Sequence, residues 1–372
     1  MSDFQRPRVL VVMGGRSSEH EISCATAAGI LRAIDRTMWD VIPIGITPDG
    51  QWVRVADDPQ ALEFHEGRGQ SIQASESSVM LVPGTRCLIE VTRSKDGMQV
   101  SDLGNVDVVF PLLHGPYGED GTIQGLFEMS GVPYVGCGVN SSAISMDKHL
   151  TKTVLAAAGI DVGRWELVTM RQWNEDPHEC SKRIDALGYP VFVKPCRAGS
   201  SIGITRVDKP ADLAAAIKEA GNNDPRIIVE ARTPGREIEC GVLARSWGSA
   251  PQASPLGEIV VPEGQFYDFA LKYFDTEGVS LTCPADVEPQ VAERIQEIAV
   301  RAFDTLECEG LARVDFFYDP QTGSIVVNEV NTMPGFTPFS MYPHMWAKAG
   351  IDYTQLLNEV LNEALSRPSG LR

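Results

Sequence analysis

Apolar residues in the N-terminal third of the chain form short continuous runs, separated by longer segments with a different spacing. Three runs are mostly apolar, as expected for strands that are buried on both faces of a parallel sheet: residues 8–13, 41–46 and 107–113. Between the first two runs, apolar residues recur with helical spacing as far as Ile34. Strands that alternate with helices predict an α/β domain, in which ligands bind beyond the carboxyl ends of the strands. Gly14-Gly15 and His114-Gly115 follow two of these ends.

Two further segments of this region carry cap or turn signals. Residues 18–21 have the order Ser-Glu-His-Glu, which resembles a capping box and predicts that the helix begins there. Residues 56–106 are polar and weakly patterned, and turn chemistry at residues 95–97 predicts a hairpin within them.

The pattern changes after a glycine-rich junction at residues 136–138. A small α+β unit is predicted next, with helices at 147–158 and 211–220 and strands at 191–194, 204–207 and 227–230. The last third is predicted to mix strands with longer helices. Its predicted elements are strands at 238–243, 258–261, 312–317 and 326–330, a helix at 291–306 and two helices after residue 338.

The last two predicted strands bring oxygen ligands together. Asp315 lies within one apolar run, and Glu329 and Asn331 lie two residues apart in the next. Alternate residues of a strand share a face, and turn chemistry at residues 319–323 predicts that the two strands form a hairpin. Two carboxylates and an amide oxygen suit Mg²⁺, which completes its shell with water and phosphate oxygens. The pattern therefore predicts a site for a metal-bound nucleotide.

Composition narrows the class of protein further. The 372-residue chain can form two or three domains, and its formal net charge of −18 argues against binding to nucleic acid or to an anionic membrane. The N-terminus has no signal-peptide pattern, and no apolar run is long enough to span a bilayer. Eight scattered cysteines without a Cys-x-x-Cys pair favour reduced thiols. We therefore expect a cytoplasmic enzyme that acts on small molecules.

A Gly/Ser loop at residues 197–203, with Ser200 and Ser201 near its centre, could close over phosphate oxygens. On its own this loop could equally be an ordinary hairpin connection. Three lysines, taken as a set, strengthen the phosphate interpretation: Lys148, Lys194 and Lys272. The chain lacks the P-loop motif, and it also lacks the third glycine and the acidic residue of a dinucleotide site.

Four polar residues beside these motifs each have two interpretations. Glu230 and Glu237 could contact adenine and ribose, or they could be solvated at a strand end. Glu19 could hold a cationic amine in the cleft, whereas a role in complementing the helix dipole is preferred for Glu21. His114 could act in the site or be a loop histidine with satisfied hydrogen bonds.

Residues 266–273 form an aromatic-rich segment that ends in Lys272 and Tyr273. The segment could be a packed surface loop. It could also be a lid, with Tyr273 closing over a reacting phosphate.

Taken together and in this order, these segments resemble the D-alanine:D-alanine ligases of the ATP-grasp superfamily. The matching runs are residues 14–23, 114–122, 146–148, 193–203, 266–273, 313–315 and 328–335, with Ser340. The resemblance covers nearly the whole chain. It implies three α/β domains, of α+β type in the ATP-binding part, with ATP between the second and third. The implied boundaries are an N-terminal parallel-sheet domain at residues 1–136, a central domain at 137–230 and a C-terminal domain at 231–372.

The resemblance also implies which residues bind ATP and metal. The residues implied to contact the phosphates are Lys148, Lys194, Lys272, Ser200 and Ser201. The residues implied to contact adenine and ribose are Glu230 and Glu237. Asp315, Glu329 and Asn331 would hold two Mg²⁺ ions, for which Mn²⁺ could substitute.

For the first substrate, the resemblance implies that Glu19 binds the ammonium group of a D-alanine near His114. A hydrogen-bonded linkage of Glu19, Ser200 and Tyr273 would hold the lid closed. Water exclusion by this lid would protect the reactive intermediate from hydrolysis.

For the second step, Arg313 and the backbone N–H of Gly335 would stabilise an oxyanion, and Ser340 would bind the second carboxylate. The implied reaction joins two D-alanine molecules through an acylphosphate, with release of ADP and phosphate, for peptidoglycan synthesis. The resemblance further implies a homodimer. Two rival functions are a D-alanine:D-lactate ligase, whose lid differs from residues 266–273, and a non-catalytic nucleotide-binding regulator, which would be expected to lack the metal ligands or Arg313.

Overall fold

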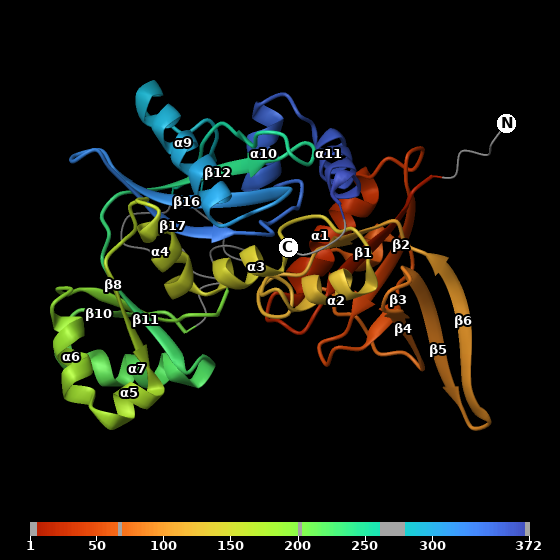
Figure 1. The fold of residues 1–372 in the computed structure, drawn as a ribbon, viewed down its shortest axis with the longest axis horizontal. Helices are drawn as coiled ribbons and strands as arrows, with labels where there is room; N and C mark the ends of the chain where they lie inside the picture. Colours follow the sequence, from red (N-terminus) through yellow and green to blue (C-terminus); the bar gives the residue numbers. More distant parts are fainter. Residues whose placement is uncertain (1–5, 66–68, 200–202, 261–279, 369–372) are drawn as a thin grey trace.

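The computed structural model of the chain describes residues 6–65, 69–199, 203–260 and 280–368. Its strands form four sheets, three of which are the centres of larger units (Figure 1). In Figure 1 the N-terminal unit lies on the right, the small central unit at the lower left and the C-terminal sheet at the upper left.

The N-terminal unit is built on a mainly parallel sheet, as predicted. Its elements are β1 (Arg8–Gly14), α1 (His20–Ala33), β2 (Asp40–Ile46), β3 (Trp52–Arg54), the short helix η1 (Pro59–Leu62), β7 (Val108–Pro111) and α2 (Thr122–Ser130). The strand order is β3-β2-β1-β7, and only β3 is antiparallel to its neighbour. Val9 and Val11 pack in one core with α1, while Leu10 and Val12 pack in another with α2. β1 is therefore buried on both faces, which explains its continuous apolar run.

The weakly patterned segment before β7 forms a separate antiparallel sheet. Its strands are β4 (Ser77–Leu81), β5 (Cys87–Ser94) and β6 (Gly97–Asn105). The hairpin predicted at residues 95–97 is confirmed, because Ser94 pairs with Gly97 across the turn. β6 is exposed over most of its length and lies at the right-hand margin of Figure 1. This exposure explains why its sequence is polar.

The central unit has an antiparallel sheet with the order β10-β9-β11-β8. Its elements are β8 (Trp165–Thr169), α5 (Met170–Glu175), α6 (Pro177–Asp185), β9 (Val191–Pro195), β10 (Thr205–Val207), η2 (Pro210–Asp212), α7 (Leu213–Asn223) and β11 (Arg226–Ala231). The helices α3 (Val139–Met146) and α4 (Lys148–Ala157) lead into it. The predicted α+β character is confirmed, but β8, α5 and α6 were missed by the sequence pattern.

The C-terminal unit is an antiparallel sheet with the order β15-β14-β12-β16-β17. Its elements are β12 (Arg236–Leu243), β13 (Gln252–Ala253), β14 (Gly257–Val260), β15 (Ser280–Thr282), α9 (Pro289–Thr305), β16 (Leu311–Asp319), β17 (Ser324–Asn331), α10 (Met341–Lys348) and α11 (Tyr353–Ser366). The hairpin predicted at residues 319–323 is confirmed, since Asp319 pairs with Ser324. The two predicted C-terminal helices are α10 and α11.

The C-terminal helix connects this unit to the N-terminal one. Leu357 and Leu361 of α11 share a core with Val9 and Val11 of β1. Trp39 donates a hydrogen bond from its indole Nε1 to Asn358 Oδ1 at 2.8 Å. The first and last parts of the chain therefore pack into one core, as their adjacent places in Figure 1 indicate.

The predicted capping box at residues 18–21 is wrong. The N-cap of α1 is Glu19, and no side-chain hydrogen bond caps the helix there. Tertiary contacts fix the entry to the helix instead: Gly15 adopts a φ of 97°, and His20 Nδ1 lies 2.7 Å from the carbonyl oxygen of Gly15. The side chain of Glu19 is thereby available to line a cavity between the units.

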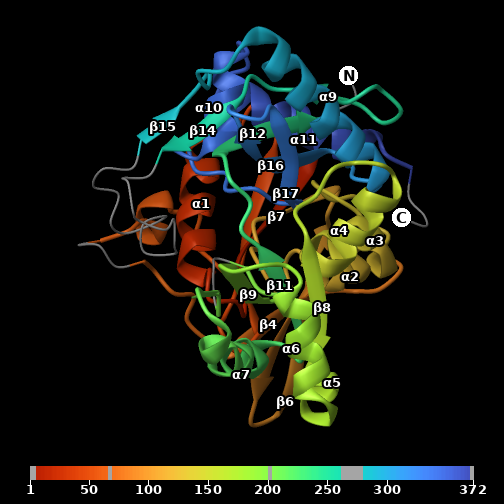
Figure 2. The ribbon, with the colours of Figure 1, turned by 90° about the vertical axis from the view of Figure 1, so that its left-hand side faces the viewer.

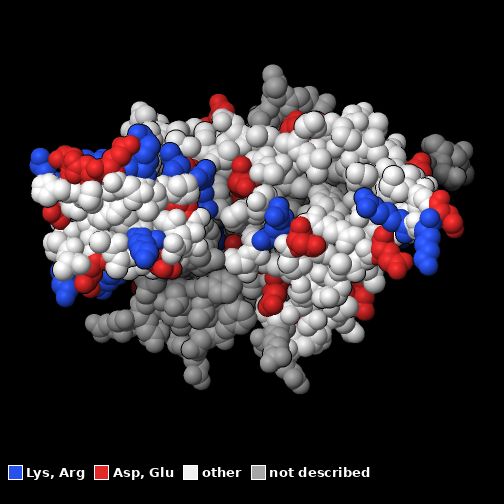
Figure 3. Space-filling view, turned by 90° about the horizontal axis from the view of Figure 1, so that it is seen from below, with Lys and Arg blue, Asp and Glu red and all other residues white. Residues whose placement is uncertain are grey.

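None of the helices in the described parts of the chain combines the length and the apolar character that a bilayer crossing requires. Seen from below, acidic and basic side chains are interspersed over the surface of the molecule (Figure 3).

Candidate active site

The three units meet around a cavity of about 790 Å³. Residues from α1, β9 and β17 line it, and Figure 2 shows these elements around the middle of the molecule. The carboxyl ends of β1 and β7 also point toward this cavity. Glu19 follows β1 in the sequence, His114 follows β7, and both residues line the cavity. The prediction that these strand ends carry a ligand site is consistent with this position.

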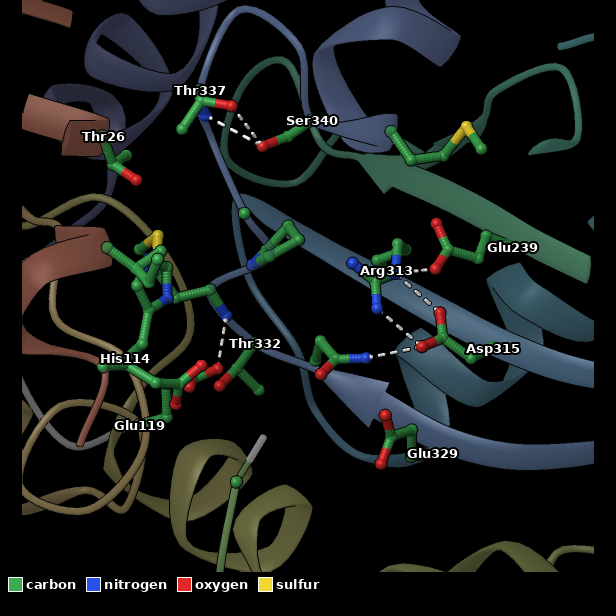
Figure 4. Close-up of a pocket in the computed structure, with 18 of the residues that line it drawn as sticks. Thr26, His114, Glu119, Glu239, Arg313, Asp315, Glu329, Thr332, Thr337 and Ser340 are labelled. Atoms are coloured by element: carbon green, nitrogen blue, oxygen red, sulfur yellow. Dashed lines mark hydrogen bonds and ion pairs between the residues drawn. The ribbon is translucent and has the colours of Figure 1, made fainter. Parts of the chain in front are cut away.

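Three carboxylates form a row across the floor of the cavity. Glu239 of β12 pairs with Asp315 of β16, which pairs with Glu329 of β17, and we call these three residues the carboxylate row. Two residues further along the hairpin Arg313 pairs with Asn331, so Asp315, Glu329 and Asn331 share one face, as predicted. Figure 4 shows Arg313 beside the row, with His114 and Glu119 on the other side of the cavity.

Arg313 is held by two carboxylates. Its Nε and Nη2 donate to Oδ1 and Oδ2 of Asp315, both at 2.7 Å, and its Nε lies 3.3 Å from Glu239 Oε1. Burial disfavours the charged guanidinium, but Asp315 and Glu239 outweigh it and raise the pKa of Arg313 well above its ordinary value. The side chain is therefore a permanent, preorganised cation in the cavity wall.

The same face carries the donor set that was predicted for a metal. Asn331 Nδ2 donates to Asp315 Oδ2 at 3.0 Å, which leaves the amide oxygen of Asn331 as a further ligand atom. Within the described residues, no three His, Cys, Asp or Glu side chains are grouped to hold an ion by themselves. Mg²⁺ needs no such cage, because it takes one or two carboxylates and fills its shell with water and phosphate oxygens. The hard oxygen donors of this face fit that requirement.

A buried ion-pair cluster lies at the neighbouring end of β9. Lys194 Nζ lies 2.5 Å from Glu230 Oε2, and Lys152 Nζ lies 2.9 Å from Glu230 Oε1. Burial raises the pKa of Glu230, but Lys194 and Lys152 oppose it and hold this pKa far below its ordinary value. Glu230 is only 7% exposed, so the interpretation of a solvated strand end is wrong for this residue. The sequence pattern missed Lys152, although it stands four residues after Lys148 on one helix face.

A second cavity of about 300 Å³ adjoins this cluster. Lys194 and Glu237 line both cavities, so the second one opens beside the first. Its wall combines the apolar side chains of Phe192, Phe317 and Val327 with polar groups. A narrow site with apolar faces and a few polar groups suits a flat heterocycle.

The Gly/Ser loop is anchored firmly at its first residues. Arg197 forms a fork with Asp224, at 2.9 Å for Nε and 2.7 Å for Nη2, and its backbone N–H also donates to Asp224. Lys148 Nζ donates to the carbonyl oxygen of Ala198 at 2.7 Å. The loop then passes close to Glu19: a Cβ at Gly199 would lie 3.0 Å from Glu19 Oε2. A larger residue at position 199 would require the Glu19 side chain to shift.

Four predicted site residues lie outside the described part of the chain. They are Ser200, Ser201, Lys272 and Tyr273.

His114 and Glu119 form the N-terminal wall of the cavity. Burial lowers the pKa of His114, and the carboxylate of Glu19 offsets this only in part. His114 Nε2 is buried without a hydrogen-bond partner among the described residues, so the interpretation of a satisfied loop histidine is wrong. Glu119 accepts hydrogen bonds from the backbone N–H groups of Gly115 at 2.7 Å and Met333 at 3.2 Å. It therefore joins the loop after β7 to the loop after β17.

Glu119 gives a testable dependence of stability on pH. Burial, followed by repulsion from Glu19, raises the pKa of Glu119 from 4.5 to about 8. Because the folded state holds this proton more tightly, the stabilisation is complete below about pH 4.5 and is lost as the pH rises through 8, at ~1.4 kcal/mol per unit. We expect the free energy of unfolding of the wild type to fall with pH relative to that of Glu119→Gln. Urea unfolding between about pH 5 and 8.5 measures this difference. Parallel curves for the two proteins would contradict the raised pKa.

Ser340 and Gly335 lie on the loop between β17 and α10. Ser340 Oγ accepts a hydrogen bond from the backbone N–H of Thr337 at 3.1 Å and lies 2.8 Å from Thr337 Oγ1. A Cβ on Gly335 would lie 3.1 Å from Ser340 Oγ, so the two residues are neighbours on the cavity wall. Of the described members of the predicted site, Glu230 lines only the second cavity, and the large cavity brings the others together: Glu19, His114, Lys148, Lys194, Glu237, Arg313, Asp315, Glu329, Asn331, Gly335 and Ser340.

A small antiparallel unit with lysines and a second antiparallel sheet with oxygen ligands, facing each other across a cavity, define the ATP-grasp class of protein. Two family models match the chain, one described as D-ala D-ala ligase N-terminus at residues 8–137 and one as D-ala D-ala ligase C-terminus at residues 154–362. The chain belongs to the D-alanine--D-alanine ligase family.

Relatives and solved structures agree with this assignment. The D-alanine--D-alanine ligase of Kineococcus radiotolerans is 52% identical, over 100% of both chains. That of Streptomyces coelicolor is 49% identical, over 98% of this chain and 95% of the relative. The D-alanine-D-alanine ligase of Coxiella burnetii has a TM-score of 0.79 and 35% identity, covering 97% of this chain and 94% of its own. The VanG D-Ala:D-Ser ligase of Enterococcus faecalis has a TM-score of 0.80 and 36% identity, covering 97% and 100%.

Proposed function

We propose that this protein uses ATP to join two molecules of D-alanine into D-alanyl-D-alanine, a precursor for peptidoglycan, with release of ADP and phosphate. The observation that carries the proposal is the meeting of the carboxylate row, Arg313 and two lysines in one cavity of a chain from this family. A carboxylate-amine ligase needs these parts, because it must neutralise phosphate charge and then stabilise an oxyanion.

ATP would lie across the two adjoining cavities. Its adenine would enter the smaller one, near Glu230 and Glu237, and its phosphates would extend toward Lys148 and Lys194. Lys194 would exchange part of its ion pair with Glu230 for a phosphate oxygen. Lys272, Ser200 and Ser201, as the resemblance implies, would complete the phosphate site.

Asp315, Glu329 and Asn331 would hold two Mg²⁺ ions, with Mn²⁺ as a substitute, and the hard oxygens of this face support that assignment. When bound, the ions would neutralise phosphate charge. The three side chains would hold the ions on one face of the hairpin, because Asp315 pairs with Glu329 and Arg313 pairs with Asn331.

In the first step, a carboxylate oxygen of one D-alanine attacks the γ-phosphorus, the bond to the bridging oxygen breaks, and ADP leaves. Glu19 would hold the ammonium group of this D-alanine near His114, where both side chains are buried. Gly199 and Gly115 lie close to Glu19 and would help to exclude water from this corner, and Tyr273 and Ser200 would complete the closure.

In the second step, the amine of the other D-alanine attacks the acyl carbon, a proton is lost, and phosphate leaves with the oxygen that it received. Arg313 and the backbone N–H of Gly335 would stabilise the oxyanion, and donors of this kind typically contribute ~3 kcal/mol each. Ser340 would bind the carboxylate of the second D-alanine.

We also propose the domain boundaries and the assembly that the resemblance implies. The four strands of the central sheet lie between Trp165 and Ala231, so this sheet ends one residue after the proposed boundary at residue 230. All eight cysteines are free thiols, which supports a cytoplasmic location. A homodimer is proposed from the resemblance, and sedimentation analysis of the purified protein tests it.

The proposed function is tested by phosphate release together with mass analysis of the product, using D-alanine, D-serine, D-lactate and L-alanine. The D-Ala:D-Ser ligase and the D-alanine ligase among the solved structures match this chain equally well, so the second substrate has to be measured. We expect D-alanyl-D-alanine to be the main product. ATP turnover that depends on none of these compounds, or that gives no dipeptide, would contradict the proposal.

A further inference from the structure

Glu239 is a buried carboxylate that the fold alone does not require. It lies between Ile238 and Cys240, both core residues of β12, and it is only 4% exposed. Burying a charge in an apolar strand is unfavourable unless the charge is paired, and an apolar residue of similar size often serves stability as well or better. The reason for a carboxylate at this position therefore lies in the cavity that it lines.

The neighbouring Asp315 has two competing tasks. Its Oδ2 accepts hydrogen bonds from Arg313 and from Asn331, and its Oδ1 accepts one from Arg313. A carboxylate oxygen has about two acceptor positions, so both positions of Oδ2 are used. If Asp315 also binds a metal, the ion competes with Arg313 and Asn331 for the two oxygens of this carboxylate.

Glu239 is a second carboxylate that forms an ion pair with the same guanidinium. Its Oε1 lies 3.3 Å from Arg313 Nε, and Figure 4 shows Glu239 and Asp315 approaching Arg313 together. We infer that Glu239 is a positioning residue that keeps Arg313 aimed at the reacting carbonyl oxygen while Asp315 is committed to the metal. This inference rests on the proposed ligation and adds a residue to it.

The first test is Glu239→Ala. Loss of the ion pair between Glu239 and Arg313 should lower kcat by about 10- to 100-fold, the range expected for one contact to a charged group. The KM for ATP should stay within about threefold of the wild-type value, because ground-state binding does not use this contact. Mn²⁺ binding in the presence of ADP, followed by electron paramagnetic resonance, should also be unchanged, and this readout needs no turnover.

Two further variants separate contact from charge. Glu239→Gln keeps an oxygen within reach of Arg313 Nε and should retain more activity than Glu239→Ala. Glu239→Asp keeps the charge but is shorter by one methylene group, so it should resemble Glu239→Ala. The inference is overturned if Glu239→Asp has the kcat of the wild type while Glu239→Gln is as slow as Glu239→Ala. In that case the negative charge at position 239 matters, and the contact with Arg313 does not.

A matched control is available on the next strand of the sheet. Glu258 is also buried and forms a fork with Arg236, at 2.7 and 2.6 Å, but it does not line the large cavity. Glu258→Ala should cost similar stability and leave kcat unchanged. Thermal unfolding of all variants shows whether each remains folded at the assay temperature.

A double-mutant cycle completes the test. In the Arg313→Lys background, Glu239→Ala should have little further effect, since the residue acts through Arg313. Additive losses in kcat would overturn the inference, as would full kcat in Glu239→Ala. If the wild-type protein forms no dipeptide, the proposed function itself is contradicted. Failure of the proposed function can therefore be distinguished from failure of the inference about Glu239.

Discussion

Replacing Glu329 with glutamine should abolish most of the ligase activity and leave the fold intact. The variant keeps the size of the side chain but replaces one of the two carboxylates proposed to bind metal with a neutral amide. Metal-assisted charge neutralisation contributes several kcal/mol, so kcat should fall by about two to three orders of magnitude. The fold should persist because Glu329 is only partly buried, at the cavity edge of β17. Steady-state kinetics at saturating Mg²⁺, together with the thermal unfolding midpoint, measure both expectations.

Asp319→Asn is a suitable control for this change. Asp319 is a carboxylate of the same hairpin, but its contacts are to Gln321 and Thr322 in the turn. This variant should keep its activity. Near-normal turnover of Glu329→Gln at saturating Mg²⁺ would rule out Glu329 as a metal ligand.

Arg313→Lys should reduce kcat far more than the affinity for ATP. Lysine keeps the positive charge but has a single nitrogen, which cannot form the fork with Asp315 and contact Glu239 as well. Loss of one preorganised oxyanion donor typically lowers kcat by about 100- to 1,000-fold. Isothermal calorimetry for ATP and steady-state kinetics separate the two effects. If ATP binding collapses while kcat is spared, Arg313 is a nucleotide anchor and its proposed role is wrong.

Local sequence patterns predicted the elements that depend on neighbours in the chain. The turn at residues 319–323 and the i, i+2 spacing of Glu329 and Asn331 predicted the hairpin and its ligand face, but it is a register shift between Asp315 and Phe316, which the sequence did not indicate, that brings Asp315 opposite Glu329. The parallel sheet followed from continuous apolar runs. The fork between Arg313 and Asp315 follows from the same spacing, since both side chains leave β16 on one side.

Pairings between distant strands could not be read from the sequence. Glu239 was missed because its place opposite Asp315 depends on the register of β12 and β16, which are far apart in the chain. The only local signal was a second acidic residue, two positions after Glu237, in an otherwise apolar strand. The sequence predicted that the charge of Lys194 needs a partner. In the structure this partner is Glu230 on the neighbouring strand β11, and a phosphate could be a second one.

The capping box at residues 18–21 shows how a local signal can lose to tertiary contacts. The glycines before α1 and the hydrogen bond from Ile72 to His20 set the first turn, and the N-cap residue Glu19 makes no side-chain hydrogen bond that caps the helix. The missed strand β8 has a related cause, because its pairing with β11 at the edge of the central sheet supports a segment whose own pattern is weak.

The most direct test of the proposed reaction uses D-alanine labelled with ¹⁸O in both carboxylate oxygens. If the carboxylate attacks the γ-phosphorus and the amine then displaces phosphate, one ¹⁸O passes to phosphate for each dipeptide formed. Mass analysis of phosphate and dipeptide from the same reaction measures this ratio. We predict one labelled oxygen per phosphate and one phosphate per D-alanyl-D-alanine. Dipeptide formation with unlabelled phosphate would contradict the acylphosphate route, and the absence of any D-alanine-dependent phosphate would contradict the ligase assignment.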